Sequence, residues 1–204
     1  MAYYYYLSSP VKAEYKIKSS EFIVRLKPVE SVPKAKDFIK NISHRHIDAS
    51  HNCWAYIVGK NADTFHASDA GEPPGTAGKP ILNSLKKYSL TNIAAVVTRY
   101  FGGTKLGIRG LINAYSGTVI QTVKKTTLKK LVEYKRFCIQ TDYAFLDEFK
   151  FNLQQLEAKL ENIRYTTVID MNVKIEAKKS SKLQTYLENL AQAQKIKILN
   201  NSNS

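Results

Sequence analysis

The alternation of apolar and polar positions in the first 131 residues predicts short strands interleaved with three helices. Two alternating runs, 13–18 and 21–26, predict a strand pair joined by a turn at Ser19 and Ser20. An apolar stripe at helical spacing follows, and it predicts a helix capped by Ser31 with Pro33 in its first turn. The further predicted elements are strands at 53–58 and 64–66, a helix at 81–87, a fully buried strand at 93–98 and a helix at 109–125.

The remaining residues carry a different pattern, in the order β-α-β-β-α-β. The expected elements are a strand at 132–141, a helix at 143–161, strands at 165–170 and 172–176, a helix at 180–191 and a strand at 195–199. The first of these helices has apolar residues on one face: Phe145, Phe149, Leu153, Leu156 and Leu160. This order is the split βαβ of a ferredoxin-like domain, and residues 200–204 read as a polar tail. We therefore predict an α+β protein with two domains, 1–131 and 132–204.

The charge is distributed unevenly between these two halves. Residues 1–131 contain 20 basic and 8 acidic side chains, whereas residues 132–204 contain 11 and 9. The window from Pro73 to Val132 contains no acid and ten bases. They are Lys79, Lys86, Lys87, Arg99, Lys105, Arg109, Lys124, Lys125, Lys129 and Lys130. Such a one-sign stretch favours an anionic partner, although a generally basic proteome or acids folded in from elsewhere would also produce it.

Cysteine usage and hydropathy indicate a cytoplasmic protein. The two cysteines, Cys53 and Cys138, are 85 positions apart and neither belongs to a CxxC pair, which indicates no disulfide framework. The start of the chain lacks a cationic segment followed by a long apolar run, so no signal peptide is expected. No apolar run approaches the roughly 20 residues of a membrane span.

Three kinds of chemistry are open to the first half. Hydrolysis is one, because Cys53 and His51 share a face of the predicted strand and Asp69 and Glu72 stand on a nearby loop. Against it, Cys53 lies in an apolar run, these residues match no zinc spacing, and carboxylates on such loops commonly fix turns. Neither a metal nor a cofactor is expected.

Phosphate binding is better motivated. The loop 102–107 connects the buried strand to a helix start, and Lys105 and Arg109 flank it. Its glycines would let backbone N–H groups approach an anion, or would merely satisfy positive φ angles in a turn. Exposed aromatics beside these bases would stack on RNA bases, although aromatics next to apolar runs are more often core. The aromatics in question are Tyr88, Tyr100, Phe101 and Tyr115.

Three long segments resemble the YigZ/IMPACT family. They are HNCWAY at 51–56, ASDAGEPPGTAGKPIL at 67–82 and VVTRYFGGTKLGIRGLINAY at 96–115. The resemblance implies a first domain with the βαβ fold shared with domain IV of elongation factor G. It implies a second, ferredoxin-like domain similar to domain V of that factor, and an RNA or ribosome contact with no established reaction. Translation factors are further candidate partners, and the oligomeric state stays open.

The chain departs from the family pattern at two positions. Ala70 stands where the pattern has a second aspartate, so a mechanism that needs adjacent carboxylates is in doubt. Arg109 stands where the pattern has a glycine, which adds a cation at the helix start. Family-motif residues without an assigned role are His51, Asn52, Asp69, Glu72, Gly102, Gly103 and Gly107.

Our hypothesis is a non-catalytic RNA- or ribosome-binding protein, with regulation of translation as its candidate role. Its nucleic-acid-binding residues would be Lys79, Lys86, Lys87, Arg99, Tyr100, Lys105 and Arg109. The alternative is a hydrolase or phosphate-ligand enzyme that uses His51, Asp69 and Glu72. An enclosed pocket that joins these three residues to Arg99 would favour the enzyme, and an open basic face would favour the binder.

Overall fold

The chain is an α+β protein built of two compact units. The computed structural model describes residues 3–199, so the expected polar tail at 200–204 lies outside the described residues. The boundary between the units falls between Leu131 and Val132, and each unit has a hydrophobic core of its own. Within residues 3–199, no helix is both long and apolar enough to span a membrane.

The first unit is organised around a five-stranded sheet. Its strands in spatial order are β2 (Val11–Ile17), β3 (Ser20–Pro28), β6 (Ile93–Tyr100), β4 (His51–Val58) and β5 (Thr64–Ser68). All neighbouring pairs are antiparallel. Strands β3 and β4 both run opposite to β6, which lies between them, so the β3-α1-β4 segment is a split βαβ unit.

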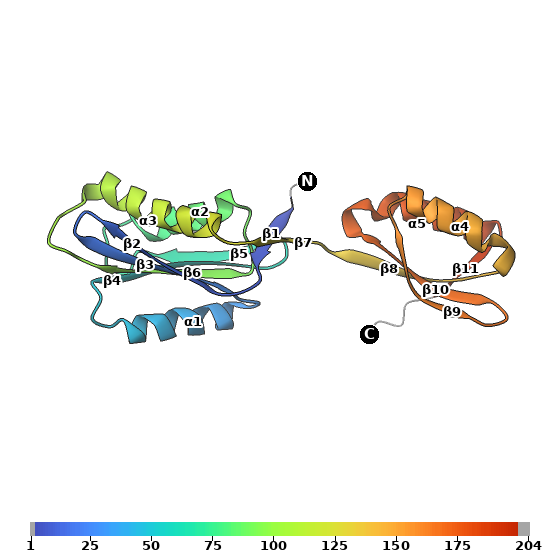
Figure 1. The fold of residues 1–204 in the computed structure, drawn as a ribbon, viewed down its shortest axis with the longest axis horizontal. Helices are drawn as coiled ribbons and strands as arrows, with labels where there is room; N and C mark the ends of the chain where they lie inside the picture. The colour runs from blue at the N-terminus through green and yellow to red at the C-terminus, as the bar shows by residue number, and fades with distance from the viewer. Residues whose placement is uncertain (1–2, 200–204) are drawn as a thin grey trace. The chain divides into compact units, whose positions relative to one another are not determined.

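Helices cover both faces of this sheet (Figure 1). Helix α1 (Val32–Arg45) covers one face, whereas α2 (Gly78–Lys87) and α3 (Gly107–Lys124) cover the other. Ser31 caps α1 as predicted, since its hydroxyl accepts from the Lys34 N–H at 3.4 Å.

Residues of the central strand β6 alternate between these two layers. Ile93, Ala95 and Val97 belong to the core under α2 and α3, whereas Ala94 and Val96 belong to the core under α1. This alternation is the period of two expected of a strand. It places Arg99 on the α2–α3 side and Tyr100 on the α1 side.

One part of the first unit was not predicted. Strand β1 (Tyr4–Leu7) pairs in antiparallel fashion with β7 (Leu128–Leu131) as a separate two-stranded sheet. Lys129 and Lys130 therefore lie in a strand that follows the end of α3.

The second unit has the element order expected from its pattern. Its helices are α4 (Leu146–Gln155) and α5 (Ser180–Gln192). Its strands, in the spatial order β11-β8-β10-β9, are β11 (Ile196–Leu199), β8 (Tyr134–Thr141), β10 (Ile169–Glu176) and β9 (Lys159–Tyr165). Each neighbouring pair is antiparallel.

Two boundaries in this unit differ from prediction. The helix predicted over 143–161 ends at Gln155, and Glu157 has φ +57, a left-handed conformation that terminates the helix. Leu160 lies in β9 although its spacing from Leu156 is helical. The next two strands were predicted at 165–170 and 172–176. They are instead β9 at Lys159–Tyr165 and β10 at Ile169–Glu176.

The turn between β2 and β3 packs tightly against the loop that follows β6. A Cβ added at Gly102 would lie 1.7 Å from the carbonyl oxygen of Ser19, closer than any contact that the turn could accept. Gly117, in the middle of α3, has open space where a Cβ would stand. A methyl group should therefore have opposite effects on stability at these two positions.

We expect Gly102→Ala to destabilise the first unit by about 1–3 kcal/mol, because the turn must move to admit the methyl group. Gly117→Ala, the matched control, should stabilise it by about 0.5–1 kcal/mol, since alanine loses less backbone entropy in a helix. Trp54 is the single tryptophan and lies in β4, so its fluorescence during urea unfolding reports this unit. Equal effects of the two substitutions would contradict the packing described here.

Candidate functional site

A cavity of about 430 Å³ lies beside the start of helix α3. Its polar lining comes from Ser50, His51, Glu72, Arg99 and Lys105. The apolar lining consists of Pro73, Phe101, Leu106, Ile108 and Leu111, with Gly107 between them. Its volume falls within the range of small-ligand sites in proteins.

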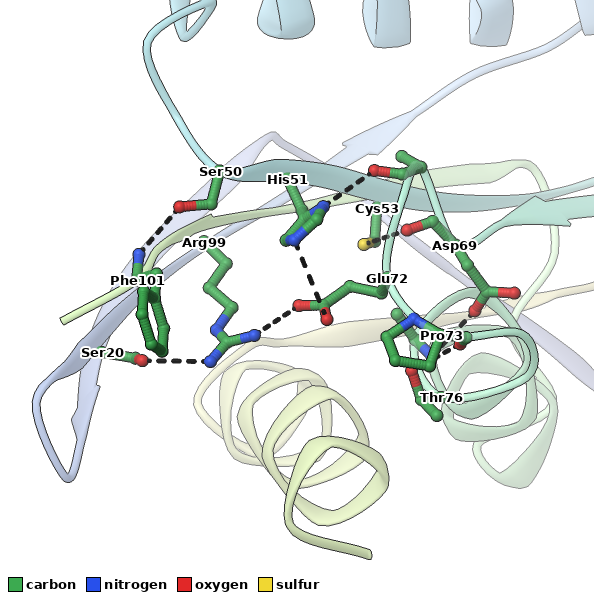
Figure 2. A network of polar contacts seen from close by, with 12 residues as sticks. Ser20, Ser50, His51, Cys53, Asp69, Glu72, Pro73, Thr76, Arg99 and Phe101 are labelled. Atoms are coloured by element: carbon green, nitrogen blue, oxygen red, sulfur yellow. Dashed lines mark hydrogen bonds and ion pairs between the residues drawn. The ribbon is translucent and has the colours of Figure 1, made fainter. Parts of the chain in front are cut away.

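Two strands and one loop bring the polar groups together (Figure 2). His51 at the start of β4 is the direct register partner of Arg99 near the end of β6, so their side chains emerge side by side on the α2–α3 face. Glu72 reaches the same point from the loop between β5 and α2. Three segments far apart in the sequence thus converge on one spot.

Glu72 and Arg99 form a buried ion pair. An Nη atom of Arg99 donates to Glu72 Oε1 at 2.7 Å. Arg99 is 5% exposed and Glu72 is 7% exposed. The Tyr115 hydroxyl donates to the same carboxylate oxygen at 2.8 Å, and the second Nη of Arg99 donates to Ser20 Oγ at 3.2 Å. The additional hydrogen bonds offset part of the cost of removing both charges from water.

His51 is held with one ring nitrogen directed toward this pair. Its Nδ1 lies 3.0 Å from the carbonyl oxygen of Ala70, which can only accept, so Nδ1 carries a hydrogen. Nε2 then faces Glu72 Oε2 at 3.9 Å, too far for a direct hydrogen bond. Gly71 has φ +91, and a Cβ there would lie 3.1 Å from His51 Nδ1, so a glycine is required for this approach.

Cys53 is a core residue, not a nucleophile. It is fully buried, and its thiol donates to the carbonyl oxygen of Asp69 at 2.8 Å. Burial raises the pKa of Cys53 to about 12, so the reactive thiolate is absent at neutral pH. A Cys53–His51 nucleophilic pair is therefore not supported.

Asp69 does not join His51 and Glu72 in the cavity. Its Oδ1 accepts from the backbone N–H groups of Ala77 and Gly78 at 2.9 and 2.8 Å, and Oδ2 accepts from that of Gly75 at 2.9 Å. These bonds cap the start of α2, whose own cap residue, Ala77, offers no side-chain acceptor. His51 and Glu72 share the cavity as expected, but the expectation that Asp69 joins them is wrong.

The structure separates Asn52 and Tyr100 from the cavity as well. Asn52 accepts from Thr98 Oγ1 and donates to the carbonyl oxygen of His46, which caps α1. The Tyr100 hydroxyl contacts His46 Nδ1 at 2.8 Å. Both side chains thus lie on the α1 side of the sheet, and Tyr100 does not share a face with the bases of α2.

The predicted basic residues divide into one buried and several exposed. Lys79, Lys86 and Lys87 are exposed on α2, Lys105 is exposed in the loop before α3, and Arg109 is exposed in its first turn. Lys86 lies over the ring of Phe65. Arg99 is the exception, because its guanidinium is enclosed by Glu72 and Ser20. Arg99 was predicted to contact nucleic acid, and the structure instead buries it.

Two glycines of the loop after β6 adopt left-handed conformations that leave open space beside them. Gly103 and Gly107 have φ +86 and +72, and the space beside each is empty. Helix α3 begins at Gly107 without a side-chain cap, so its first N–H groups have no side-chain acceptor.

Sequence reasoning missed two residues of the network, Ser20 and Tyr115. Tyr115 was expected as a candidate for stacking on RNA but is fully buried and anchors Glu72. Burial raises the pKa of Tyr115 far above its usual value, so its hydroxyl remains a donor. Its position four residues after Leu111 and four before Val119, both buried in α3, is the signal that would have placed it in the core.

No group of three or more His, Cys, Asp or Glu side chains within residues 3–199 is placed to hold a metal ion. The polar groups of the cavity are instead suited to hydrogen bonding with an uncharged or mixed-charge ligand.

Comparison with known proteins places these residues in a family. The Impact N-terminal domain matches residues 18–123. The chain is 34% identical to the IMPACT family member YvyE of Bacillus subtilis, over 92% of this chain and 86% of that protein. It is 35% identical to the IMPACT family member YigZ of Escherichia coli, over 88% and 89% of the two chains. A crystal structure of a hypothetical protein covers the whole chain and is itself wholly covered, with TM-score 0.62 and 31% identity. The chain belongs to the IMPACT family.

We expect Asp69→Asn to destabilise the first unit by about 1 kcal/mol at pH 7, because the amide loses the negative charge and presents a donor where one carboxylate oxygen accepted from the backbone. Desolvation raises the pKa of Asp69, but the hydrogen bonds from Gly75, Ala77 and Gly78 outweigh it, and the net pKa is lowered. A carboxylate with a depressed folded-state pKa stabilises the fold above its unfolded pKa, about 3.9, and loses that effect as pH falls through the folded value.

The stability difference between the wild type and Asp69→Asn should therefore shrink as pH falls below about 4. Urea unfolding followed by Trp54 fluorescence at pH 7 and pH 3 measures it. Asp37→Asn, a change at an exposed carboxylate of α1, serves as the control and should have little effect. A difference for Asp69→Asn that is the same at both pH values would show that the charged cap is unimportant.

Proposed function

We propose that this IMPACT family member binds single-stranded RNA through the exposed bases of its α2–α3 layer. The observation that carries the proposal is the distribution of charge on this layer. Of the ten bases in the acid-free stretch 73–132, all except Arg99 are exposed. They lie on α2, before and at the ends of α3, and in β7.

Two carboxylates of the loop before α2 are engaged within the protein. Glu72 is paired with the buried Arg99, and Asp69 accepts three backbone hydrogen bonds at the start of α2. The opposite layer differs, since α1 carries bases and an acid together and its Lys34 pairs with Glu30. An uncompensated basic surface is the electrostatic feature by which proteins bind the phosphates of nucleic acids.

A groove between α2 and α3 would guide the RNA backbone. It has a volume of about 460 Å³, and Lys79 and Lys87 line it together with the small polar side chains of Asn83, Ser84 and Ser116. The hydroxyls of Ser84 and Ser116 donate to the carbonyl oxygens of Pro80 and Ile112, so the two lysines would supply the phosphate contacts. Lysines contact phosphate without reading sequence, so the proposed binding has little sequence preference.

The ribosome is a natural source of such RNA. The likeness of the two units to domains IV and V of elongation factor G, implied by the family resemblance, stays an expectation. The β-α-β-β-α-β order and the antiparallel sheet of residues 132–199 support it.

The rival proposal of a hydrolase loses support, because Asp69 is committed to helix capping and Cys53 is not ionised.

The test is a fluorescence-anisotropy titration of a single-stranded RNA of about 20 nucleotides. With about five phosphate contacts, affinity should fall on the order of 100-fold between 50 and 200 mM salt. Lys105→Gln combined with Arg109→Gln should weaken binding at least roughly tenfold at 100 mM salt, because two contacts are lost. The pair Lys79→Gln and Lys87→Gln should act similarly.

The matched control is Lys36→Gln with Lys40→Gln, which removes the same charge from exposed positions on α1. It should leave affinity nearly unchanged. The proposal is overturned if RNA does not bind at 50 mM salt, or if the α1 variant weakens binding as much as the α2 and α3 variants.

A further inference from the structure

The cavity beside α3 has two acceptor atoms in its lining that no donor of the described residues satisfies. The hydrogen bonds that Glu72 accepts both end on Oε1, where Arg99 and Tyr115 donate. Its Oε2 lies 3.9 Å from His51 Nε2, too far for a hydrogen bond. The hydrogen of His51 is on Nδ1, which donates to the carbonyl oxygen of Ala70, so Nε2 offers a lone pair.

Both acceptors are accessible to a ligand in the cavity. His51 and Glu72 line it. In the described part of the chain, two side-chain polar atoms are closed off from solvent without a hydrogen bond, Arg99 Nε and the Tyr186 hydroxyl. Glu72 Oε2 also accepts no hydrogen bond but is not one of these atoms, so it keeps accessible surface. A carboxylate oxygen this deeply buried is costly without a donor, and a ligand that donates to it is favoured.

The distance between the two acceptors suits an amino group. An –NH₂ nitrogen can lie about 2.9 Å from each atom and direct one hydrogen to each. A carbonyl oxygen at the same place would face two lone pairs and would be repelled. The pair formed by His51 Nε2 and Glu72 Oε2 therefore selects a donor group and rejects an acceptor.

The charges around the cavity favour an uncharged amino group over an ammonium. The carboxylate of Glu72 is already paired with Arg99 at 2.7 Å, and Lys105 adds a further cation to the lining. An ammonium would therefore enter a site whose net charge is positive. An amino group on an aromatic ring provides the same hydrogens without the charge.

The rest of the lining is suited to a flat ring. Pro73, Leu106 and Leu111 are apolar, and Phe101 and Ile108 are 47% and 66% exposed. An exposed aromatic side chain beside cations is the kind of surface on which an unpaired nucleobase stacks. Adenine, cytosine and guanine each carry a ring-bound amino group. Uracil instead has a carbonyl oxygen on each side of its N–H.

We infer that the cavity binds one unpaired, amino-bearing base of the RNA, with the amino group between His51 Nε2 and Glu72 Oε2 and the ring against Phe101. This assignment rests on the proposed RNA binding. It adds a preference at one base, for adenine, cytosine or guanine over uracil, to lysine contacts that do not read sequence. Lys105 contacts the adjoining phosphate. A free nucleoside presents the same amino edge, so the experiment separates the two sources.

The test compares an oligouridylate of about ten nucleotides with the same RNA carrying one central cytidine. Cytosine and uracil have rings of equal size and differ in the edge that meets the acceptors. The cytidine RNA should bind about tenfold more tightly at 100 mM salt, because it gains a hydrogen bond to a carboxylate.

His51→Ala should reduce this preference at least about threefold, because one acceptor is lost. It should leave the affinity for oligouridylate unchanged, since the exposed bases remain. The control is His44→Ala, a change at an exposed histidine of α1, and it should alter neither affinity. If His51→Ala weakens both RNAs equally, its role is structural and the inference is overturned.

Calorimetric titration with cytidine and uridine completes the design. Equal binding of the two RNAs overturns the inference and leaves the basic surface standing. Binding of cytidine but not uridine, with neither RNA bound at 50 mM salt, assigns the cavity to free nucleosides and overturns the proposed function. If neither nucleoside and neither RNA binds, the inference and the proposed function are both overturned.

Discussion

The ion pair between Glu72 and Arg99 is the interaction on which the arrangement of the first unit depends. It joins the loop before α2 to the end of the central strand β6, and through Tyr115 and Ser20 it reaches α3 and β3. Both charges are withdrawn from water, so each requires the other. Glu72 thereby ties the loop before α2 to the sheet, and Asp69 holds the rest of that loop through three backbone hydrogen bonds.

The two faces of the sheet have separate roles because strand residues alternate. On β4 and β6, His51, Cys53 and Arg99 face α2 and α3, whereas Asn52, Thr98 and Tyr100 face α1 and form hydrogen bonds that hold its C-terminal end. The same alternation brings the cavity and the exposed bases of α2 to one side. The cavity and the exposed bases are therefore neighbours, and Lys105 in the loop after β6 lines the cavity as well.

The parts of the structure that depend on local pattern could be predicted from the sequence. Periodicity gave the strands of the sheet, the cap at Ser31 and the β-α-β-β-α-β order, since each arises from neighbours in sequence. The pairing of β1 with β7 joins residues more than 120 positions apart, and no local pattern indicates it. The end of α4 depends on the left-handed conformation of Glu157, which a continuing apolar stripe concealed.

Only part of the candidate site could be predicted, because its contacts join residues that are distant in the sequence. His51 and Glu72 were singled out by type, but the role of Asp69 depends on N–H groups six to nine residues further along the chain. Arg99 looked like an exposed cation because the acid that neutralises it comes from a different segment. Charge counted along the chain identifies the basic surface, but only the fold shows which member of it is buried.

A double-mutant cycle on the ion pair tests the central claim most directly. Glu72→Met, Arg99→Met and the double variant are compared by urea unfolding with Trp54 fluorescence as the readout. Each single change should cost about 3–5 kcal/mol by leaving a buried charge without its partner, and the double should cost less than their sum by at least about 2 kcal/mol. The lost Tyr115 hydrogen bond is common to both variants without Glu72 and cancels in the cycle. Additive losses, within about 0.5 kcal/mol, would contradict the account.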